Sequence, residues 1–270
     1  AIRRLASTGR EGQGAGVRRR EEEQGGDEPK LQRAVSYWKP KLDKNNVISN
    51  PMHQWILPWL PHFKNESMMG TMFADIRRCL KKTLSFISKH ERSDITFFSS
   101  CIAVLSPWQK LFEASTIFGL TSESVTPRFA RSLAKMSIEF SNQDQNWDKV
   151  TALMNYFNAD LMSSDDFLSL VEGEILASWA QCLHCALESK TPNLSTTSKF
   201  YYAWKERLFG HPSNSSKSHV SLQGDLMVCR YFFGGLEMIK ASIESDQAKL
   251  ESLTPPHPKD CNYRIALMHR

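Results

Sequence analysis

Apolar side chains recur every three or four residues over most of this sequence, and this spacing limits the folds that it can adopt. The clearest stretch runs from residue 67 to residue 89 and carries Met69, Met72, Phe73, Ile76, Leu80, Leu84 and Ile87. Such spacing is typical of one face of an α-helix. Further stripes cover residues 129–140, 147–157, 168–187, 200–208 and 222–243, and no stretch shows the sustained alternation that would indicate strands. The sequence therefore predicts an all-α fold of seven or eight helices, as a helical bundle or an irregular helical-repeat stack.

The first 34 residues differ in composition from the rest. Residues 1–33 hold six of the 13 glycines and no aromatic residue. Such a segment cannot bury enough apolar surface to offset the roughly 1–2 kcal/mol per residue lost on ordering the backbone. We therefore expect residues 1–34 to be a disordered tail or linker, and the chain, which begins inside it, to be a fragment of a longer protein. The adjoining runs Arg18–Arg20 and Glu21–Glu23 indicate either a nucleic-acid or nuclear-import patch or a solvated linker. Partial cancellation of their charges favours the linker.

We divide the remainder into a helical domain, residues 35–250, and a C-terminal extension, residues 251–270. The whole chain has 34 Lys and Arg against 29 Asp and Glu, a formal net charge of +5. So mild an excess gives no reason to expect strong nucleic-acid binding. No secretory signal is visible, and the longest uncharged stretch, residues 45–63, contains three prolines that exclude a regular membrane helix. A soluble intracellular protein without membrane contacts is expected.

Motifs that would indicate an enzyme are missing. The sequence contains no GxxxxGK[ST], GxGxxG or GxSxG. Cys182 and Cys185 form a CxxC pair that could offer two thiolates to zinc. No second pair accompanies them, so packing in a helix is favoured for both, and the lone His184 between them is expected to pack rather than act as a base. We predict a non-enzyme with no catalytic, cofactor-binding or metal-binding residue; a zinc enzyme using this pair is the weaker alternative.

A basic cluster lies on the predicted helix over residues 67–89, opposite its apolar face. It consists of Arg77, Arg78, Lys81 and Lys82. Such a cluster could contact RNA phosphates or an acidic protein surface. An ordinary solvated helix face would have the same pattern, and both interpretations remain open.

The most unusual segment combines tryptophan with proline, in WKPKLD at residues 38–43 and PMHQWILPWLP at residues 51–61. Prolines fix φ and bias the preceding residue towards extended backbone. We therefore expect an extended strap that packs by its tryptophans onto the first helices, where removing one buried ring would cost about 3–5 kcal/mol. The indoles expected to anchor the whole helical body are Trp38, Trp55, Trp59, Trp108, Trp179 and Trp204.

This opening resembles that of the GC-rich sequence DNA-binding factor-like (GCFC) domain in the tuftelin-interacting protein 11 family of G-patch splicing factors. Later segments are similar to the family in the same order. They are PWQKLF at residues 107–112, Val125-x-Pro127, Trp179-x-x-x-Leu183, SKTPN at residues 189–193 and YAWK at residues 202–205. The resemblance covers about residues 35 to 245.

The resemblance implies a non-catalytic scaffold of the spliceosome in the nucleus, acting in intron-lariat release and spliceosome disassembly with a DEAH-box RNA helicase. Family members typically carry an upstream G-patch that recruits the helicase, and residues 9–16 lack the large apolar residues such an element needs. Spliceosomal proteins are thus the expected partners, and the helicase contact is expected to need a G-patch that this chain lacks. The alternative is a nucleic-acid-binding or transcription-related module of the same domain family.

Overall fold

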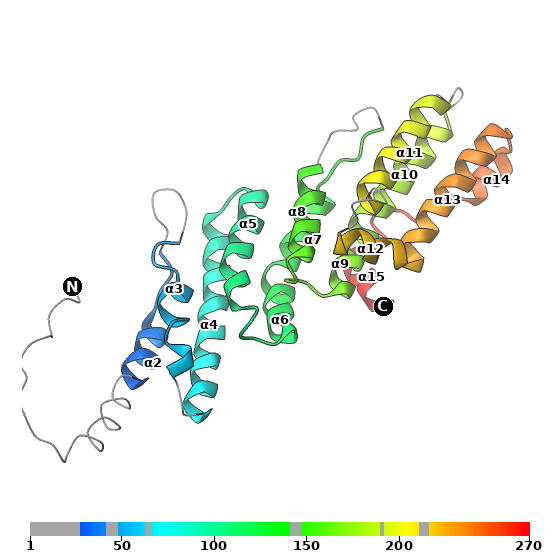
Figure 1. The fold of residues 1–270 in the computed structure, drawn as a ribbon. Helices are drawn as coiled ribbons and strands as arrows, with labels where there is room; N and C mark the ends of the chain where they lie inside the picture. Colours follow the sequence, from blue (N-terminus) through cyan, green and yellow to red (C-terminus); the bar gives the residue numbers. More distant parts are fainter. Residues whose placement is uncertain (1–27, 42–47, 63–65, 141–146, 190–191, 211–215) are drawn as a thin grey trace, which may run out of the picture. The chain divides into compact units, whose positions relative to one another are not determined.

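The computed structural model describes residues 28–41, 48–62, 66–140, 147–189, 192–210 and 216–270 (Figure 1). These residues form helices without a β-strand, so the predicted all-α class is confirmed. By contacts the chain divides into two compact units, residues 1–83 and 84–270, with the division inside helix α4 (Glu66–His90). No helix in the described ranges is long and apolar enough to cross a membrane.

The first unit begins with helix α2 (Glu28–Tyr37). The expectation of disorder is therefore wrong for residues 28–34, and residues 1–27 lie outside the described residues. Two hydrogen bonds join α2 to α4, since the Cys79 thiol donates to the Val35 carbonyl (3.3 Å) and the Ser36 hydroxyl donates to Asp75 (2.8 Å). The Val35 side chain is fully buried, and this apolar burial stabilises α2.

The tryptophan-proline strap is more helical than the sequence predicts. It forms the short helix α3 (Met52–Ile56) and the 3₁₀ turn η1 (Leu60–His62), while residues 42–47 of its insert lie outside the described ranges. Pro51 occupies the position before the first turn of α3, with φ −63° and ψ 136°, and Pro58 follows the end of that helix. Neither proline removes a hydrogen bond from the helix interior, which is the only place where it would break the helix.

The second unit contains the end of α4 and the remaining helices. They are α5 (Asp94–Leu105), the 3₁₀ turn η2 (Ser106–Trp108), α6 (Ala114–Ser124), α7 (Thr126–Ala134), α8 (Trp147–Asn158), α9 (Ser164–Leu170), the π-helix η3 (Val171–Leu176), α10 (Ala177–Leu187), α11 (Leu194–Phe209), α12 (Lys217–Gly224), α13 (Leu226–Ile243), α14 (Gln247–Ser252) and α15 (Tyr263–Met268).

Neighbouring helices of this unit pack through aromatic rings. Phe98 of α5 stacks on Phe129 of α7 with ring centroids 3.4 Å apart. Further along the chain, Trp179 of α10 meets Phe232 of α13 at 4.7 Å and Tyr201 of α11 at 5.8 Å. Helices α10, α11, α13 and α14 follow one another as adjacent layers, and α13 and α14 are the last of them (Figure 1). These stacked layers agree with the predicted helical stack.

The long apolar stripe over residues 168–187 corresponds to α9, η3 and α10, which run on without a break. At its start the Ser163 hydroxyl accepts the backbone N–H of Asp166 at 3.1 Å and caps the helix. The π-helical turn in the middle is not visible in the sequence pattern. It contains Gly173, where an added Cβ would lie 2.5 Å from the backbone of Asn262 and Tyr263, so the chain near its C-terminus contacts the helix directly at this point.

Candidate interaction surfaces

The predicted basic cluster lies on α4, with all four side chains exposed. Arg77 and Lys81 are one turn apart, as are Arg78 and Lys82, so the four project from one side of the helix. Arg78 also forms an ion pair with Asp75 at 2.8 Å, and that carboxylate accepts the Ser36 hydroxyl as well. Part of the charge of Arg78 is thus balanced within the unit, and the cluster is a basic face of moderate strength.

The six predicted tryptophan anchors fall into three groups. Trp108, Trp179 and Trp204 are buried, while Trp38 and Trp55 are half-buried. Trp59 differs from the expectation of a buried anchor, because half of its surface (50%) is exposed. The reason is local: α3 ends at Ile56, and the chain turns there so that Leu60, rather than Trp59, reaches the core.

The CxxC pair is not arranged as a metal site in the described part of the chain, where no group of three or more His, Cys, Asp or Glu could hold a metal ion. His184 is buried, and its Nε2 lies 3.1 Å from the Leu250 carbonyl. Burial raises the pKa of the Cys182 thiol to about 11, and Cys185 adds to the shift. At neutral pH the Cys182 thiol of the metal-free protein therefore stays protonated.

Arg128 of α7 binds the corner between α4 and α5, and sequence reasoning did not single it out. Its guanidinium donates to Asp94 at 2.8 Å and to the Glu91 carbonyl at 2.9 Å, and it lies over the Phe97 ring at 4.1 Å. Burial by itself would raise the pKa of Asp94. The nearby Ser132 hydroxyl and the charges of Arg128 and Lys149 outweigh burial and hold that pKa below its usual range. Most N–H groups of the Arg128 guanidinium thus donate to atoms within this unit, so its role is structural.

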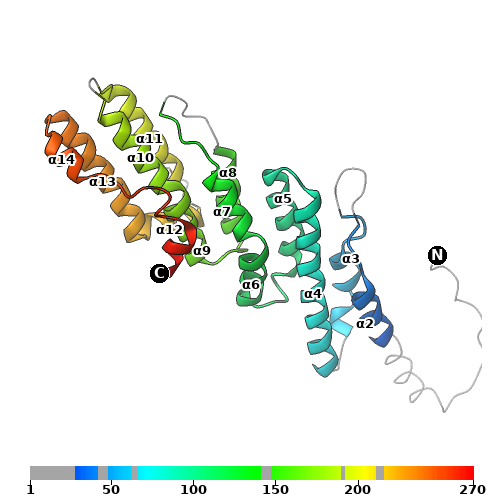
Figure 2. The same cartoon turned by 180° about the vertical axis from the view of Figure 1, so that it is seen from behind.

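The C-terminal segment packs against other helices of the second unit, with α15 beside α9 and η3 (Figure 2). Arg270 forms ion pairs with Glu172 (2.9 Å) and Asp225 (2.7 Å), and all three side chains are largely buried. The backbone N–H of Tyr263 donates to Glu174 at 2.9 Å, and burial raises the pKa of this carboxyl above its usual range. Sequence reasoning could not find these contacts, because the partners lie 45 to 98 positions apart.

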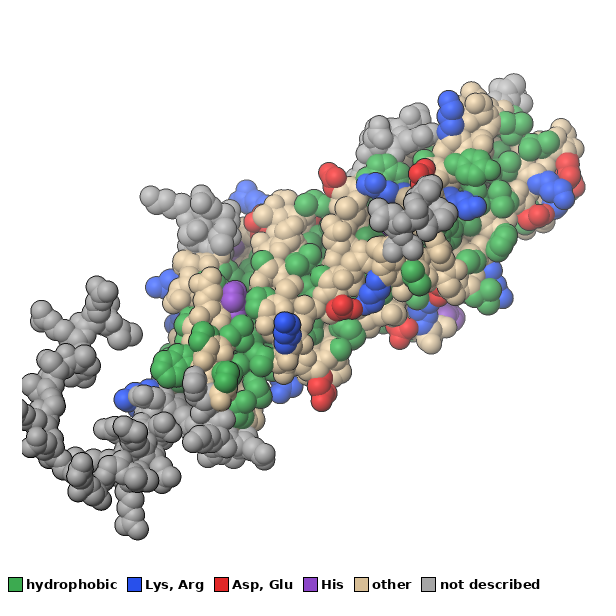
Figure 3. All heavy atoms as spheres, viewed as in Figure 1, with side chains coloured by type: hydrophobic (Ala, Val, Ile, Leu, Met, Phe, Trp, Pro, Cys, Tyr) green, Lys and Arg blue, Asp and Glu red, His purple; other side chains and the backbone are tan. Residues whose placement is uncertain are grey.

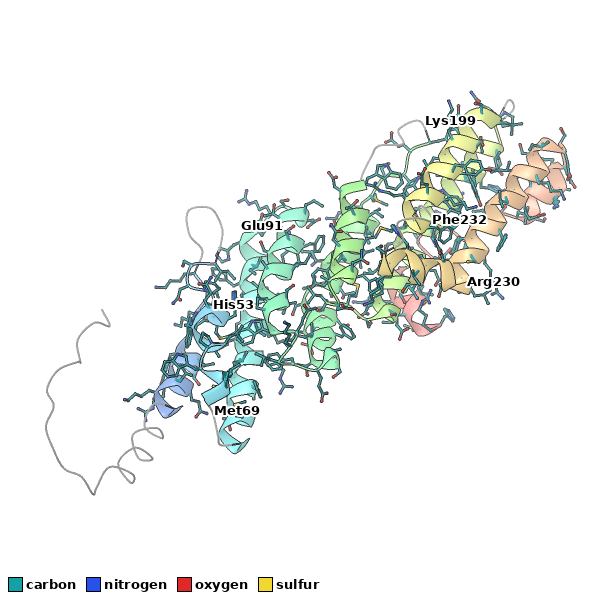
Figure 4. All side chains as sticks on the ribbon, viewed as in Figure 1. His53, Met69, Glu91, Lys199, Arg230 and Phe232 are labelled. Carbon is teal, nitrogen blue, oxygen red and sulfur yellow. The ribbon has the colours of Figure 1, made fainter. Side chains whose placement is uncertain are left out.

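A second exposed surface is apolar and lies along α13. Its members are exposed large side chains on one helix, and we call them the α13 stripe: Leu226, Phe233, Leu236 and Ile243. Figure 3 shows hydrophobic side chains at the surface over the end of the second unit that contains α13 and α14. The inward side of the same helix carries Phe232, which packs against Trp179, whereas Arg230 lies on the outward side (Figure 4).

Helical layers, an exposed basic face and an exposed apolar stripe together define a helical module suited to contacts with other macromolecules. The profile of the GC-rich sequence DNA-binding factor-like (GCFC) protein family matches residues 28–183. This match covers more than half of the chain, which therefore belongs to that family.

Three relatives illustrate the family. The chain is 23% identical over 212 residues to a septin and tuftelin-interacting protein 1 homolog of Dictyostelium discoideum, covering 66% of this chain and 22% of the relative. It is 25% identical over 181 residues to septin-interacting protein 1 of Drosophila melanogaster, covering 67% and 19%. A G-patch domain-containing protein of Schizosaccharomyces pombe is 24% identical over 238 residues, covering 85% and 25%. The chain thus spans about a fifth to a quarter of the length of these relatives, whose names describe interactions or a domain and no reaction.

Proposed function

We propose that this chain is a non-catalytic scaffold of the spliceosome, acting in pre-mRNA splicing in the nucleus. In this proposal the helical stack holds spliceosomal proteins together during intron-lariat release and spliceosome disassembly. The DEAH-box RNA helicase of that step is contacted through a G-patch, which one of the relatives carries by name. The observation that supports the proposal most is the family match over residues 28–183, a range whose described residues include helices α2 to α9 and the first half of α10.

The surfaces fit a protein-binding role better than a nucleic-acid-binding one. The net charge is only +5, and one of the four cations of the basic face is already paired with Asp75. Proteins that bind nucleic acid by charge alone need a larger basic field, because affinity grows with the number of phosphates neutralised. The apolar α13 stripe, in contrast, offers a contact whose strength does not depend on charge.

Affinity capture from nuclear extract tests the proposal. The tagged 270-residue chain is expected to retain spliceosomal proteins after nuclease treatment, identified by mass spectrometry against a tag-only control. A fluorescent fusion is expected to accumulate in the nucleus. The helicase is expected in the capture only when a G-patch is fused upstream. Complete loss of spliceosomal proteins on nuclease treatment would contradict a protein scaffold.

The second candidate is a nucleic-acid-binding module, and the exposed basic face of α4 is the observation that favours it. If this face binds single-stranded RNA, the variant Arg77→Glu with Lys81→Glu should flatten the salt dependence of affinity, by roughly 0.7 in logarithmic slope for each phosphate that is no longer neutralised. The matched control is Lys199→Glu with Lys205→Glu on α11, which makes the same change of charge at exposed positions of another helix. An equal slope in the two variants would remove this candidate.

A further inference from the structure

Helix α13 carries large apolar side chains on the side that faces solvent. Phe233 is 67% exposed, Leu226 65%, Ile243 61% and Leu236 42%. The opposite side of the same helix is already packed, since Phe232 contacts Trp179 and a Cβ on Gly235 would lie 2.8 Å from the Trp179 ring. The helix therefore has two apolar faces, and in the described structure only one of them is covered.

The spacing of the stripe is that of a coiled-coil seam. Leu226 and Phe233 are seven residues apart, Leu236 follows three residues later, and Ile243 comes seven residues after that. In a heptad these residues occupy positions a, a, d and d, which lie on one line along the helix. Cys229 and Lys240 complete the seam at the remaining d and a positions. A surface of this shape fits a second helix lying along it.

The seam is symmetric about its own midpoint, between residues 234 and 235. Two antiparallel copies of α13 would place Leu226 opposite Ile243 of the second copy and Phe233 opposite Leu236 of the second copy. The polar Lys240 would face Cys229 of the second copy, and a lone lysine at an a position is a known means of setting register. Each layer occurs twice around the two-fold axis, so one helix supplies both halves of the contact.

The charges beside the seam agree with the same pairing. Arg230 and Glu237 both occupy e positions, and antiparallel helices bring e positions opposite each other. Arg230 of one copy would thus meet Glu237 of the other, twice by symmetry. Within its own chain Glu237 pairs with the half-buried Lys249 (3.0 Å), while Arg230 contacts the Met227 sulfur and forms no ion pair in the described part of the structure.

We propose that the α13 stripe is a homodimer interface in which two copies of this chain pair antiparallel through α13. The stripe exposes roughly 500 Å² of apolar surface per copy, so a dimer would bury roughly 1,000 Å², near the lower limit for a specific interface. The dimer is therefore reversible and concentration-dependent.

Sedimentation equilibrium of the full 270-residue chain tests the proposal. Between about 5 and about 500 µM, where an interface this small associates, the average mass is expected to rise towards twice that of the monomer. Phe233→Glu and Leu236→Lys are each expected to stay monomeric over this range. Both side chains are exposed, so the far-UV circular dichroism spectrum and melting temperature should be unchanged. The matched control is Tyr37→Glu, an equally drastic change at an exposed residue of α2, which should dimerise like wild type.

Mixing the two variants tests the orientation of the pair. In a mixed dimer the glutamate introduced at position 233 of one copy would face the lysine introduced at position 236 of the other. The second layer would keep Phe233 against Leu236. Equal amounts of the Phe233→Glu and Leu236→Lys variants should therefore recover dimer that neither forms alone. Parallel helices would place the two altered residues opposite unaltered ones, and mixing would recover nothing.

Three results would overturn the proposal. A wild-type chain that remains monomeric to about 500 µM would show that the stripe takes a different partner or none. A dimer that persists in Phe233→Glu and Leu236→Lys would place the interface elsewhere. Failure of the mixed variants to associate would refute the antiparallel pairing.

Discussion

Substitution of Gly173 by alanine tests whether the C-terminal segment is an integral part of the second unit. Gly173 lies in the π-helix, where its missing side chain lets the backbone of residues 262 and 263 approach. A Cβ would lie 2.5 Å from the carbonyl carbon of Asn262, 2.5 Å from the nitrogen of Tyr263 and 2.8 Å from the Asn262 oxygen. All three are backbone atoms, so no side-chain rotation relieves the contact.

Two opposing effects set the size of the change. Forcing an extra carbon into a packed site typically costs about 1–3 kcal/mol. Alanine is favoured over glycine inside a helix by about 0.5–1 kcal/mol. We therefore expect Gly173→Ala to lower the free energy of unfolding by about 1–2 kcal/mol, and the melting temperature of this unit by about 4 °C.

Gly119→Ala is the matched control. Gly119 lies in α6 of the same unit, and a Cβ there would meet nothing within 4 Å. This variant should gain the helical preference of alanine without the clash, raising the free energy of unfolding by about 0.5–1 kcal/mol. Urea unfolding followed by far-UV circular dichroism should therefore move the two midpoints in opposite directions. Stabilisation of both variants to the same extent would refute the close backbone contact.

Deleting residues 261–270 separates the clash from any other effect of the substitution. The deletion removes Asn262, Tyr263 and Arg270, and with them the ion pairs to Glu172 and Asp225. Without the opposing backbone, Gly173→Ala should no longer destabilise. The double-mutant cycle should give a coupling of about 2 kcal/mol between residue 173 and the C-terminal segment. A coupling near zero would mean that the segment does not press on the π-helix.

The remaining predictions concern stability. Trp108→Ala should lower the free energy of unfolding by about 3–5 kcal/mol because the ring is buried. Trp59→Ala should lower it by less than about 1.5 kcal/mol because half of that residue is exposed. Equal losses for the two variants in urea unfolding would contradict this difference. Arg128→Met should lower the free energy of unfolding by about 2 kcal/mol. The loss is no larger because Asp94 is a third exposed, so solvent screens its charge. The pKa of Asp94 is lowered in the folded protein, so its contribution is present above the unfolded pKa of about 3.9 and is lost as the pH falls through the folded value. Acid unfolding of Asp94→Asn should therefore lack this component, and an unchanged acid profile would refute the ion pair.

Local patterns determined the class of fold and located α4, α7, α8, α10, α11 and α13, and they carried the resemblance to the family. They gave no position for α2, α5, α6, α14 or α15. The apolar period over residues 67–89 predicted α4, found at Glu66–His90, because the face of a helix is set by residues three and four positions apart. The cap at Ser163 is equally local, because it joins residues three positions apart. The helix predicted over residues 129–140 is shorter in the structure, because α7 ends at Ala134. Phe140 lies outside the helix and packs on Phe200.

Which residues meet across the chain depends on the tertiary fold. The Arg270 ion pairs and the contact at Gly173 join segments about 45 to 98 residues apart, and no periodicity encodes such distances. The apolar stripe over residues 222–243 predicted one helix, but the structure divides it at Asp225 into α12 and α13. Periodicity also could not tell which apolar side chains of α13 would be covered, and Leu226, Phe233, Leu236 and Ile243 are exposed. Burial is a property of the neighbours that a helix finds, so the exposed α13 stripe became visible only when Phe232 and Gly235 were seen to occupy the packed side.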